Sequence, residues 1–230
     1  MSENATVIKC KVEPSKGLIT WAAEGNEGGQ FHSRTLHVPS NSSGLTIGRG
    51  YDMKQKNAGK VVNDLVAAGI PSKQAKILAK GTGLKGVAAK KFIKDNKLTT
   101  YQITLCTQKN LFDITYKDEA AEAKRVCEKA DVAKKYGKCD FDKMHPAIEE
   151  IVVDLKFRGD YNPNTRRIIQ KAISNNDLEA FTKLMSKKAK WPNVPNERFK
   201  NRKMFLEKAL KQLEKSSKLN IKPFAKLLHD

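Results

Sequence analysis

The 230-residue chain lacks any run of 18 apolar residues, so no segment is long and apolar enough to form an ordinary transmembrane helix. Its first residues, MSENATVIKCKVEPSKG, have no apolar stretch after a basic start, and we therefore expect no ordinary signal peptide. We expect synthesis in the cytoplasm and no membrane insertion. Hydrophobic residues still make up 39% of the chain, which is enough for one domain or two closely packed lobes.

Patterns that bind metals are also missing. The four histidines are too scattered for metal-ligand spacing, and no two cysteines form a CxxC pair, so we expect no metal and no cofactor. The cysteines allow three disulfide pairings, of which Cys127 with Cys139 closes the shortest loop. We expect free buried thiols, although a disulfide is compatible with action outside the cytoplasm. The four histidines are His32, His37, His145 and His229, and the four cysteines are Cys10, Cys106, Cys127 and Cys139.

Acidic residues are scarce relative to basic ones. The chain has 44 Lys and Arg against 25 Asp and Glu, a net charge of +19, which calls for a polyanionic partner or neighbourhood. The first 100 residues hold 16 basic and 7 acidic residues and the remainder hold 28 and 18, so the charge is spread. A sequence-specific DNA-binding protein would concentrate it on a helix or arm, and we expect no nucleic-acid partner. A diffuse field suits an anionic cell wall, although many of these lysines are simply a solvated surface.

The first apolar cluster, PSKGLITWAAE at residues 14–24, predicts a short helix with Ser15 as N-cap and Gly25 as C-terminal stop. Glu24 would be its last residue, at the negative end of the helix dipole. Trp21, three residues earlier, would lie on the same face and keep water from the carboxylate. Both effects favour the protonated form, which suits a general acid.

Glycine and polar residues then alternate with short apolar positions up to Asp52, which predicts a small irregular β-hairpin. Pleating would direct Leu45 and Ile47 into a core and Thr46 towards a cleft. Asp52 follows a glycine-rich turn, where a carboxylate can stay ionised. A protonated and an ionised carboxylate are what glycosidic-bond hydrolysis requires. Taken alone, however, such acids are more often solvated surface residues or turn formers.

Glu24, the segment Thr46-Ile47-Gly48-Arg49-Gly50 and Asp52 together resemble the Glu, Thr-Ile-Gly-x-Gly and Asp arrangement of phage-type lysozymes. The closer similarity is to the pesticin-like muramidases, in which the aspartate follows the threonine as it does here. GLTIGRGYDM is the most specific piece of this resemblance. Residues 145–177 are similar to the helical lobe of such enzymes and residues 196–210 to their closing helix, so the resemblance covers residues 13–212.

The resemblance implies that Glu24 is the general acid, Asp52 the second carboxylate and Thr46 the residue that helps to hold the attacking water. Glu27 remains an alternative acid. We favour Glu24 because it ends the apolar helical run, whereas Glu27 lies between Asn26 and Gly28 in a polar stretch. The expected substrate contacts are Glu27, Arg49 and Tyr51.

The implied fold is mainly α, an α+β lysozyme-like arrangement with a small β-hairpin lobe near the N-terminus and a larger helical lobe. We expect one domain over residues 1–230: an extension (1–12), the catalytic helix end and hairpin (13–56), a helical lobe (57–215) and a tail (216–230). Helical periodicity predicts helices in the lobe, although 98–112 also has strand character, and a last short helix folded back in the tail. The predicted ranges are 57–68, 72–80, 87–94, 98–112, 117–136, 145–158, 165–174, 177–188 and 196–215.

The activity implied by the resemblance is that of a muramidase, which cleaves the β-1,4 bond between N-acetylmuramic acid and N-acetylglucosamine in peptidoglycan. Direct attack by water is expected, with carboxyl groups roughly 6.5 to 9.5 Å apart. Such an enzyme would act in the periplasm of a target bacterium, as an antibacterial effector or a phage endolysin, and a periplasmic immunity protein would be a partner. The alternatives are a basic helical nucleic-acid-binding protein and a non-catalytic wall-binding module.

Overall fold

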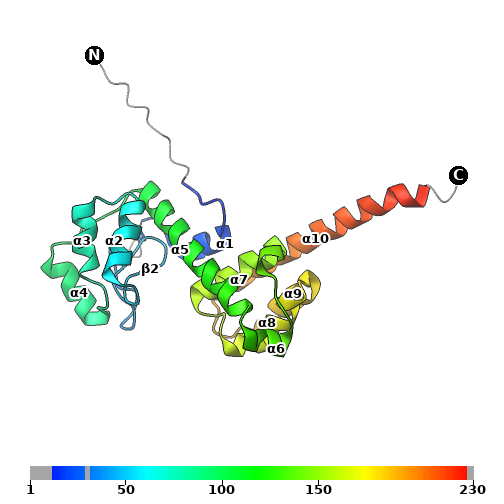
Figure 1. Cartoon of the computed structure of the whole chain (residues 1–230). Coiled ribbons are helices and arrows are strands. Elements are labelled where there is room, and N and C mark those ends of the chain that lie inside the picture. Colours follow the sequence, from blue (N-terminus) through cyan, green and yellow to red (C-terminus); the bar gives the residue numbers. More distant parts are fainter. Residues whose placement is uncertain (1–11, 29–31, 227–230) are drawn as a thin grey trace, which may run out of the picture. The chain divides into compact units, whose positions relative to one another are not determined.

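The computed structural model describes residues 12–28 and 32–226, and the chain divides into two compact units, Met1–Asp118 and Glu119–Asp230. The described residues are mainly helical, with one two-stranded antiparallel sheet (Figure 1), which confirms the predicted fold class. The first unit contains α1 (Leu18–Ala23), β1 (Thr46–Ile47), β2 (Tyr51–Asp52), α2 (Ala58–Ala67), α3 (Ser72–Ala79), α4 (Gly86–Asp95) and the first part of α5 (Leu105–Cys127). The second contains the rest of α5, α6 (Ala130–Tyr136), η1 (Phe141–Lys143), α7 (Pro146–Arg158), α8 (Pro163–Ser174), α9 (Leu178–Met185), η2 (Lys188–Lys190) and α10 (Asn196–Lys226).

Helix α1 begins later than the sequence predicts. Its N-cap is Gly17 rather than Ser15, and Gly17 has a positive φ of 77°. A Cβ atom at this position would also lie 2.5 Å from the ring of Tyr116 on α5, so only glycine fits. This close approach, together with edge-on packing of Trp21 against Phe112, seats α1 on α5.

The two helices predicted at 98–112 and 117–136 are divided differently in the structure, where Ala130–Tyr136 is the separate helix α6. Helix α5 begins at Leu105, runs through the expected break and ends at Cys127. No glycine or proline interrupts it, and the Thr115 hydroxyl donates to the Leu111 carbonyl oxygen inside the helix at 2.8 Å. The predicted short helix folded back in the tail is likewise wrong, because α10 continues to Lys226. Residues 196–222 contain neither glycine nor proline, so nothing ends the helix near residue 215.

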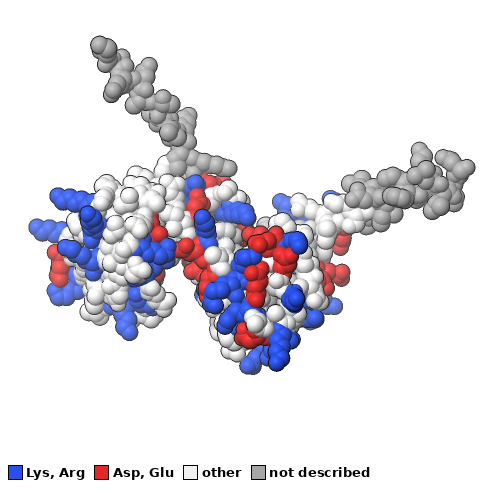
Figure 2. Space-filling view, in the orientation of Figure 1, with Lys and Arg blue, Asp and Glu red and all other residues white. Residues whose placement is uncertain are grey.

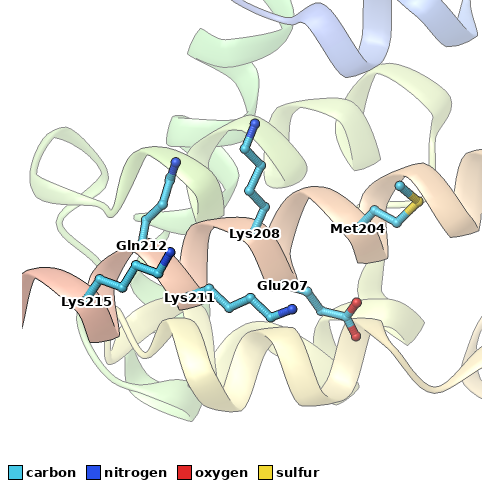
Figure 3. A pocket seen from close by; sticks show the side chains of 6 residues that line it. All are labelled: Met204, Glu207, Lys208, Lys211, Gln212 and Lys215. Atoms are coloured by element: carbon cyan, nitrogen blue, oxygen red, sulfur yellow. The ribbon is translucent and has the colours of Figure 1, made fainter.

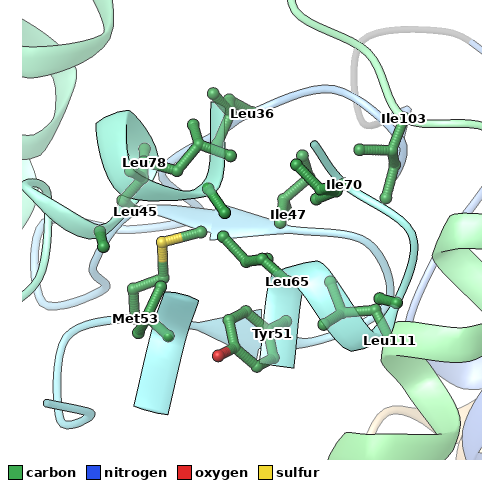
Figure 4. Close-up of a cluster of buried hydrophobic side chains, with 14 of the residues drawn as sticks. Leu36, Leu45, Ile47, Tyr51, Met53, Leu65, Ile70, Leu78, Ile103 and Leu111 are labelled. Atoms are coloured by element: carbon green, nitrogen blue, oxygen red, sulfur yellow. The ribbon is translucent and has the colours of Figure 1, made fainter. Parts of the chain in front are cut away.

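The core of the first unit joins the hairpin to the helices that follow it (Figure 4). Leu45 and Ile47 are fully buried there, as predicted, together with Leu65 of α2 and Leu78 of α3. The hairpin and these helices therefore share one core.

The register of the sheet decides which side chains face that core. Thr46 pairs with Asp52 and Ile47 pairs with Tyr51, while an isolated bridge joins His37 to Thr46. Directly paired residues point to the same face of an antiparallel sheet. His37, Thr46 and Asp52 therefore form a row on the face opposite the core.

The second unit is organised around α7, which matches the helix predicted at 145–158. Its buried residues include Asp154, whose carboxylate pairs with Arg198 at 2.5 Å and with Arg202 at 2.6 Å, both from α10. Arg202 also reaches Asp160, just beyond α7, at 3.2 Å. The buried carboxylate of Asp154 is thus paired with opposite charges, as burial of an ion requires. The apolar residues of α7 that are buried are Ala147, Ile148, Ile151, Val152, Val153 and Leu155.

A disulfide joins Cys127 to Cys139 in the second unit. Cys106 is disulfide-bonded as well, so the expectation of free thiols is wrong for the described cysteines. Cys127 is the last residue of α5, and the intervening α6 turns the chain back towards it. The Cα atoms of the two cysteines lie 6.1 Å apart, an ordinary separation for a disulfide. Cys10 lies outside the described residues.

Candidate functional site

Glu24, the expected general acid, is the residue at the C-terminal end of α1, where its backbone N–H donates to the Thr20 carbonyl oxygen at 2.9 Å. Its side chain is half-buried. Trp21, expected to shield it, has its ring centre 5.1 Å from that of Phe112 and beneath the guanidinium of Arg49. The predicted helix end therefore exists, and its tryptophan packs against α5 and Arg49.

Arg49 connects this helix end to the hairpin turn. Its Nη1 donates to the carbonyl oxygens of Trp21 and Gly25, at 2.5 and 2.6 Å, so it binds the chain on both sides of Glu24. The guanidinium carbon also lies 4.1 Å from the centre of the Trp21 ring. Only 8% of Arg49 is exposed. Arg49, expected to contact the substrate, is in the structure a clamp between the two parts of the site.

Asp52 and Thr46 are both held by Gly44. The Gly44 N–H donates to Asp52 Oδ2 at 3.0 Å, and the Gly44 carbonyl oxygen accepts from the Thr46 hydroxyl at 3.2 Å. The backbone N–H of Lys54 donates to Asp52 Oδ1 at 2.7 Å and completes the support. A Cβ atom at position 44 would collide with Asp52 Oδ1 and lie 2.6 Å from Lys54 Cβ. Gly44 is therefore required here for close approach.

Thr46 faces away from the core, as predicted, but it is only 4% exposed. Its hydroxyl hydrogen is used by Gly44, which leaves the oxygen free to accept a hydrogen bond from a water molecule. Asp52 is more open and half-buried. These two side chains are the pair that the sheet register brings together.

Tyr51 has a different role from the one expected. Its side chain is 1% exposed, and its hydroxyl donates to Asp64 Oδ2 on α2 at 2.8 Å. Burial, with the hydrogen bond and charge of Asp64, raises the pKa of Tyr51. Tyr51, expected to contact the substrate, shares the core face with Ile47.

Glu27 is held near the helix end by three side chains. It accepts hydrogen bonds from Arg34 Nε at 2.8 Å and Gln108 Nε2 at 2.6 Å, and Arg49 Nη2 lies 3.5 Å away. Burial alone would raise the pKa of Glu27, but these hydrogen bonds and the charges of Arg34 and Arg49 outweigh it, so the pKa is lowered. Glu27 is therefore an ionised group that holds two arginines in place.

Sequence reasoning missed the residues that support Glu27. Gln108 lies on α5, 81 residues further along the chain, and is fully buried. Its Oε1 accepts from the Ser33 hydroxyl at 2.8 Å, which links the loop after α1 to α5. No local pattern marks such a pair, because its two members meet only through the tertiary fold.

Charge is dispersed on the surface. Figure 2 shows Lys and Arg side chains over the visible faces of both units, interspersed with acids. A hollow of about 470 Å³ runs along α10, and it carries three lysines but a single carboxylate, Glu207 (Figure 3). It therefore lacks the carboxylate pair that hydrolysis of a glycosidic bond requires. Its lining residues are Met204, Glu207, Lys208, Lys211, Gln212 and Lys215.

Neither a metal cluster nor a membrane span occurs in the part of the chain that the structure describes. Within residues 12–28 and 32–226, no three His, Cys, Asp or Glu residues are grouped to hold a metal ion. In the same ranges no helix is both long and apolar enough to cross a bilayer.

Comparison with protein families matches residues 17–203 to DUF8812, a domain of unknown function. The chain belongs to the DUF8812 family. No curated protein matches the sequence. The DUF8812 region includes Glu24, the whole hairpin, the Cys127–Cys139 disulfide and the paired charges around Asp154.

Proposed function

We propose that this DUF8812 protein is a peptidoglycan hydrolase that cleaves the β-1,4 bond between N-acetylmuramic acid and N-acetylglucosamine. The proposal starts from the resemblance of Glu24, the TIGRG segment and Asp52 to the pesticin-like muramidases. One structural observation carries it further. Arg49, from the middle of TIGRG, binds the carbonyl groups on both sides of Glu24, so the acid and the hairpin belong to one rigid part of the first unit.

Within this site the roles follow from position. Glu24 donates a proton to the leaving oxygen as the glycosidic bond breaks. Asp52 orients the water that attacks the anomeric carbon and takes the proton that this water loses. Thr46 accepts a hydrogen bond from that water. Because Thr46 and Asp52 are directly paired, their Cβ atoms lie about 5 Å apart on the same face, a separation that one water molecule can bridge.

Glu24 is chosen over Glu27 as the general acid because Glu27 is ionised. A general acid must carry its proton before the reaction. The arginines around Glu27 lower its pKa and keep it ionised at neutral pH, which is the opposite requirement. Glu27 instead positions Arg34 and Arg49, and through Arg49 the helix end.

The charge of the chain supports a cell-wall substrate. A net charge of +19, dispersed on the visible surface, attracts an anionic polymer without a specific docking helix. The attraction would weaken as salt rises. In this proposal the protein reaches the periplasm of a target bacterium as an antibacterial effector or endolysin, and an immunity protein protects a producing cell.

Mass spectrometry of purified peptidoglycan after digestion tests the reaction. We expect disaccharide-peptides that end in reducing muramic acid from the wild type, and none from Asp52→Asn. Anhydro-muramic ends would instead identify a lytic transglycosylase, and free peptides an amidase or peptidase. Either result, or the absence of any product together with salt-sensitive retention of DNA, would overturn the proposal.

A further inference from the structure

A groove of about 480 Å³ opens beside the hairpin in the first unit. It is formed between the extended segment that carries His37 and the exposed face of α4. Its lining combines two lysines with apolar and small polar side chains, and it contains no carboxylate. The lining residues are His37, Val38, Lys90, Ile93, Lys94 and Thr99.

The charge of this groove has no counter-ion among residues 12–28 and 32–226. Lys90 and Lys94 are four residues apart on α4, so they project from the same helix face. Among the described residues neither forms an ion pair, whereas the neighbouring Lys91 pairs with Asp95 at 2.6 Å. Two like charges one turn apart repel each other slightly. A bound anion would relieve that repulsion.

The groove lies at the His37 end of the row that His37, Thr46 and Asp52 form on the sheet. His37 exchanges backbone hydrogen bonds with Thr46, at 3.0 and 2.9 Å, and Thr46 pairs in turn with Asp52. Two strand spacings separate His37 from Asp52, a distance of about 10 Å. A group in the groove would therefore belong to the same bound molecule as a sugar at Asp52. Val38 and Ile93 add apolar walls that suit the methyl and methylene groups of a short peptide.

We infer that this groove binds the free carboxylates of the stem peptides that branch from the glycan strand. The inference rests on the proposed function, which places the strand at Asp52. In an intact strand the lactyl carboxyl of muramic acid is amide-bonded to the peptide, so the negative charges nearest the sugar are those of the peptide. The two lysine ammonium groups bind these carboxylates, and the apolar walls hold the peptide carbons between them.

Binding can be measured without any hydrolysis. A soluble stem tetrapeptide with free carboxylates would be titrated into the full-length protein, and the methyl signals of Ile93 and Val38 followed by NMR. We expect saturable shifts of both signals, and at least five-fold weaker binding of the same peptide with amidated carboxylates. Equal binding of the amidated peptide, equally tight binding of inorganic phosphate, or no shift of these signals would overturn the inference.

Matched variants locate the site. Lys90→Gln combined with Lys94→Gln should weaken tetrapeptide binding at least five-fold. Lys91→Gln combined with Lys97→Gln removes the same charge from the same region outside the groove and should leave binding unchanged. An equal loss of tetrapeptide affinity in both double variants would show that binding depends only on net charge, and would contradict binding in the groove. If the wild type binds the peptide but cleaves no glycan, the muramidase proposal fails while the groove stands.

Discussion

The guanidinium of Arg49 lies over the ring of Trp21, with 4.1 Å from its central carbon to the ring centre. The same guanidinium hydrogen-bonds the carbonyl oxygens of Trp21 and Gly25. One side chain of the hairpin turn thus fixes the helix end that carries Glu24. The variable position of the Thr-Ile-Gly-x-Gly segment is here the connection between the two parts of the proposed site.

Replacing Arg49 by lysine should loosen the hairpin. A lysine ammonium cannot bridge two carbonyl oxygens and also stack on tryptophan, so buried acceptors lose their partner. We expect the free energy of opening of the hairpin to fall by about 2 kcal/mol. Hydrogen–deuterium exchange of the peptide that covers residues 44–53 measures this loss.

Arg125→Lys provides the control, since Arg125 is an exposed residue whose pair with Glu122 lies on the surface of α5. In Arg125→Lys, hydrogen–deuterium exchange of residues 44–53 should match that of the wild type. If the hairpin of Arg49→Lys were as well protected from exchange as that of the wild type, the role of Arg49 as a clamp would be contradicted.

Gly44→Ala should impair catalysis through Asp52. The added methyl group would displace the Asp52 carboxylate and break the hydrogen bond from the Gly44 N–H. We expect the rate of product release from peptidoglycan to fall at least ten-fold, with a loss of stability of about 1 to 3 kcal/mol from the collision. Product release is followed by chromatography and stability by urea unfolding.

Gly59→Ala is the matched control, because Gly59 lies in α2 with only Asn57 Oδ1, at 3.5 Å, near the added Cβ. A helical glycine-to-alanine change should stabilise the protein slightly and leave the rate unchanged. Full activity in Gly44→Ala would show that the position of Asp52 is not important.

Asp154→Asn should destabilise the second unit. Asp154 is fully buried and pairs with both Arg198 and Arg202, so the substitution removes the carboxylate that these two buried cations share, while Arg202 keeps its pair with Asp160. We expect a loss of about 3 to 5 kcal/mol at pH 7. The measurement is urea unfolding followed by the fluorescence of Trp191, in a Trp21→Phe background. Asp142→Asn, which affects an exposed pair with Lys124, should behave like the wild type.

The effect of Asp154 should depend on pH with a defined sign. Burial raises the pKa of Asp154, but the charges and hydrogen bonds of Arg202 and Arg198 outweigh it, so the folded-state pKa lies below the unfolded value of about 4. The carboxylate therefore contributes its full stability above about pH 4, and that contribution is lost as the pH falls through the folded-state pKa. The gap between the wild type and Asp154→Asn should narrow below pH 4. A gap that widened on acidification would contradict this assignment.

Local sequence patterns predicted the structure correctly where the residues that contact each other in space are also close in the sequence. The alternation of Leu45, Thr46 and Ile47 predicted the hairpin and its core face, and the apolar spacing from residue 145 onward predicted the central helix of the second unit. The pleat and the helical repeat determine these orientations directly.

Other features depend on contacts between distant segments. Tyr51 looked like a polar residue beside a cleft, but pairing with Ile47 directs it into the core towards Asp64. Gln108 supports Glu27 across 81 residues of chain. The break expected between residues 112 and 117 is absent because the Tyr116 ring packs on Phe112 within one helix. No pattern confined to one segment contains this information.

The most direct test of the two-carboxylate site compares Glu24→Gln with Glu27→Gln in one assay. Both variants are checked for folding by circular dichroism, and the release of reducing disaccharide-peptides from peptidoglycan is then measured by mass spectrometry. We predict that Glu24→Gln loses activity by at least two orders of magnitude, whereas Glu27→Gln keeps a measurable rate because it only weakens the support of Arg34 and Arg49. Full activity in Glu24→Gln, with loss in Glu27→Gln, would contradict the assignment of Glu24 as the general acid.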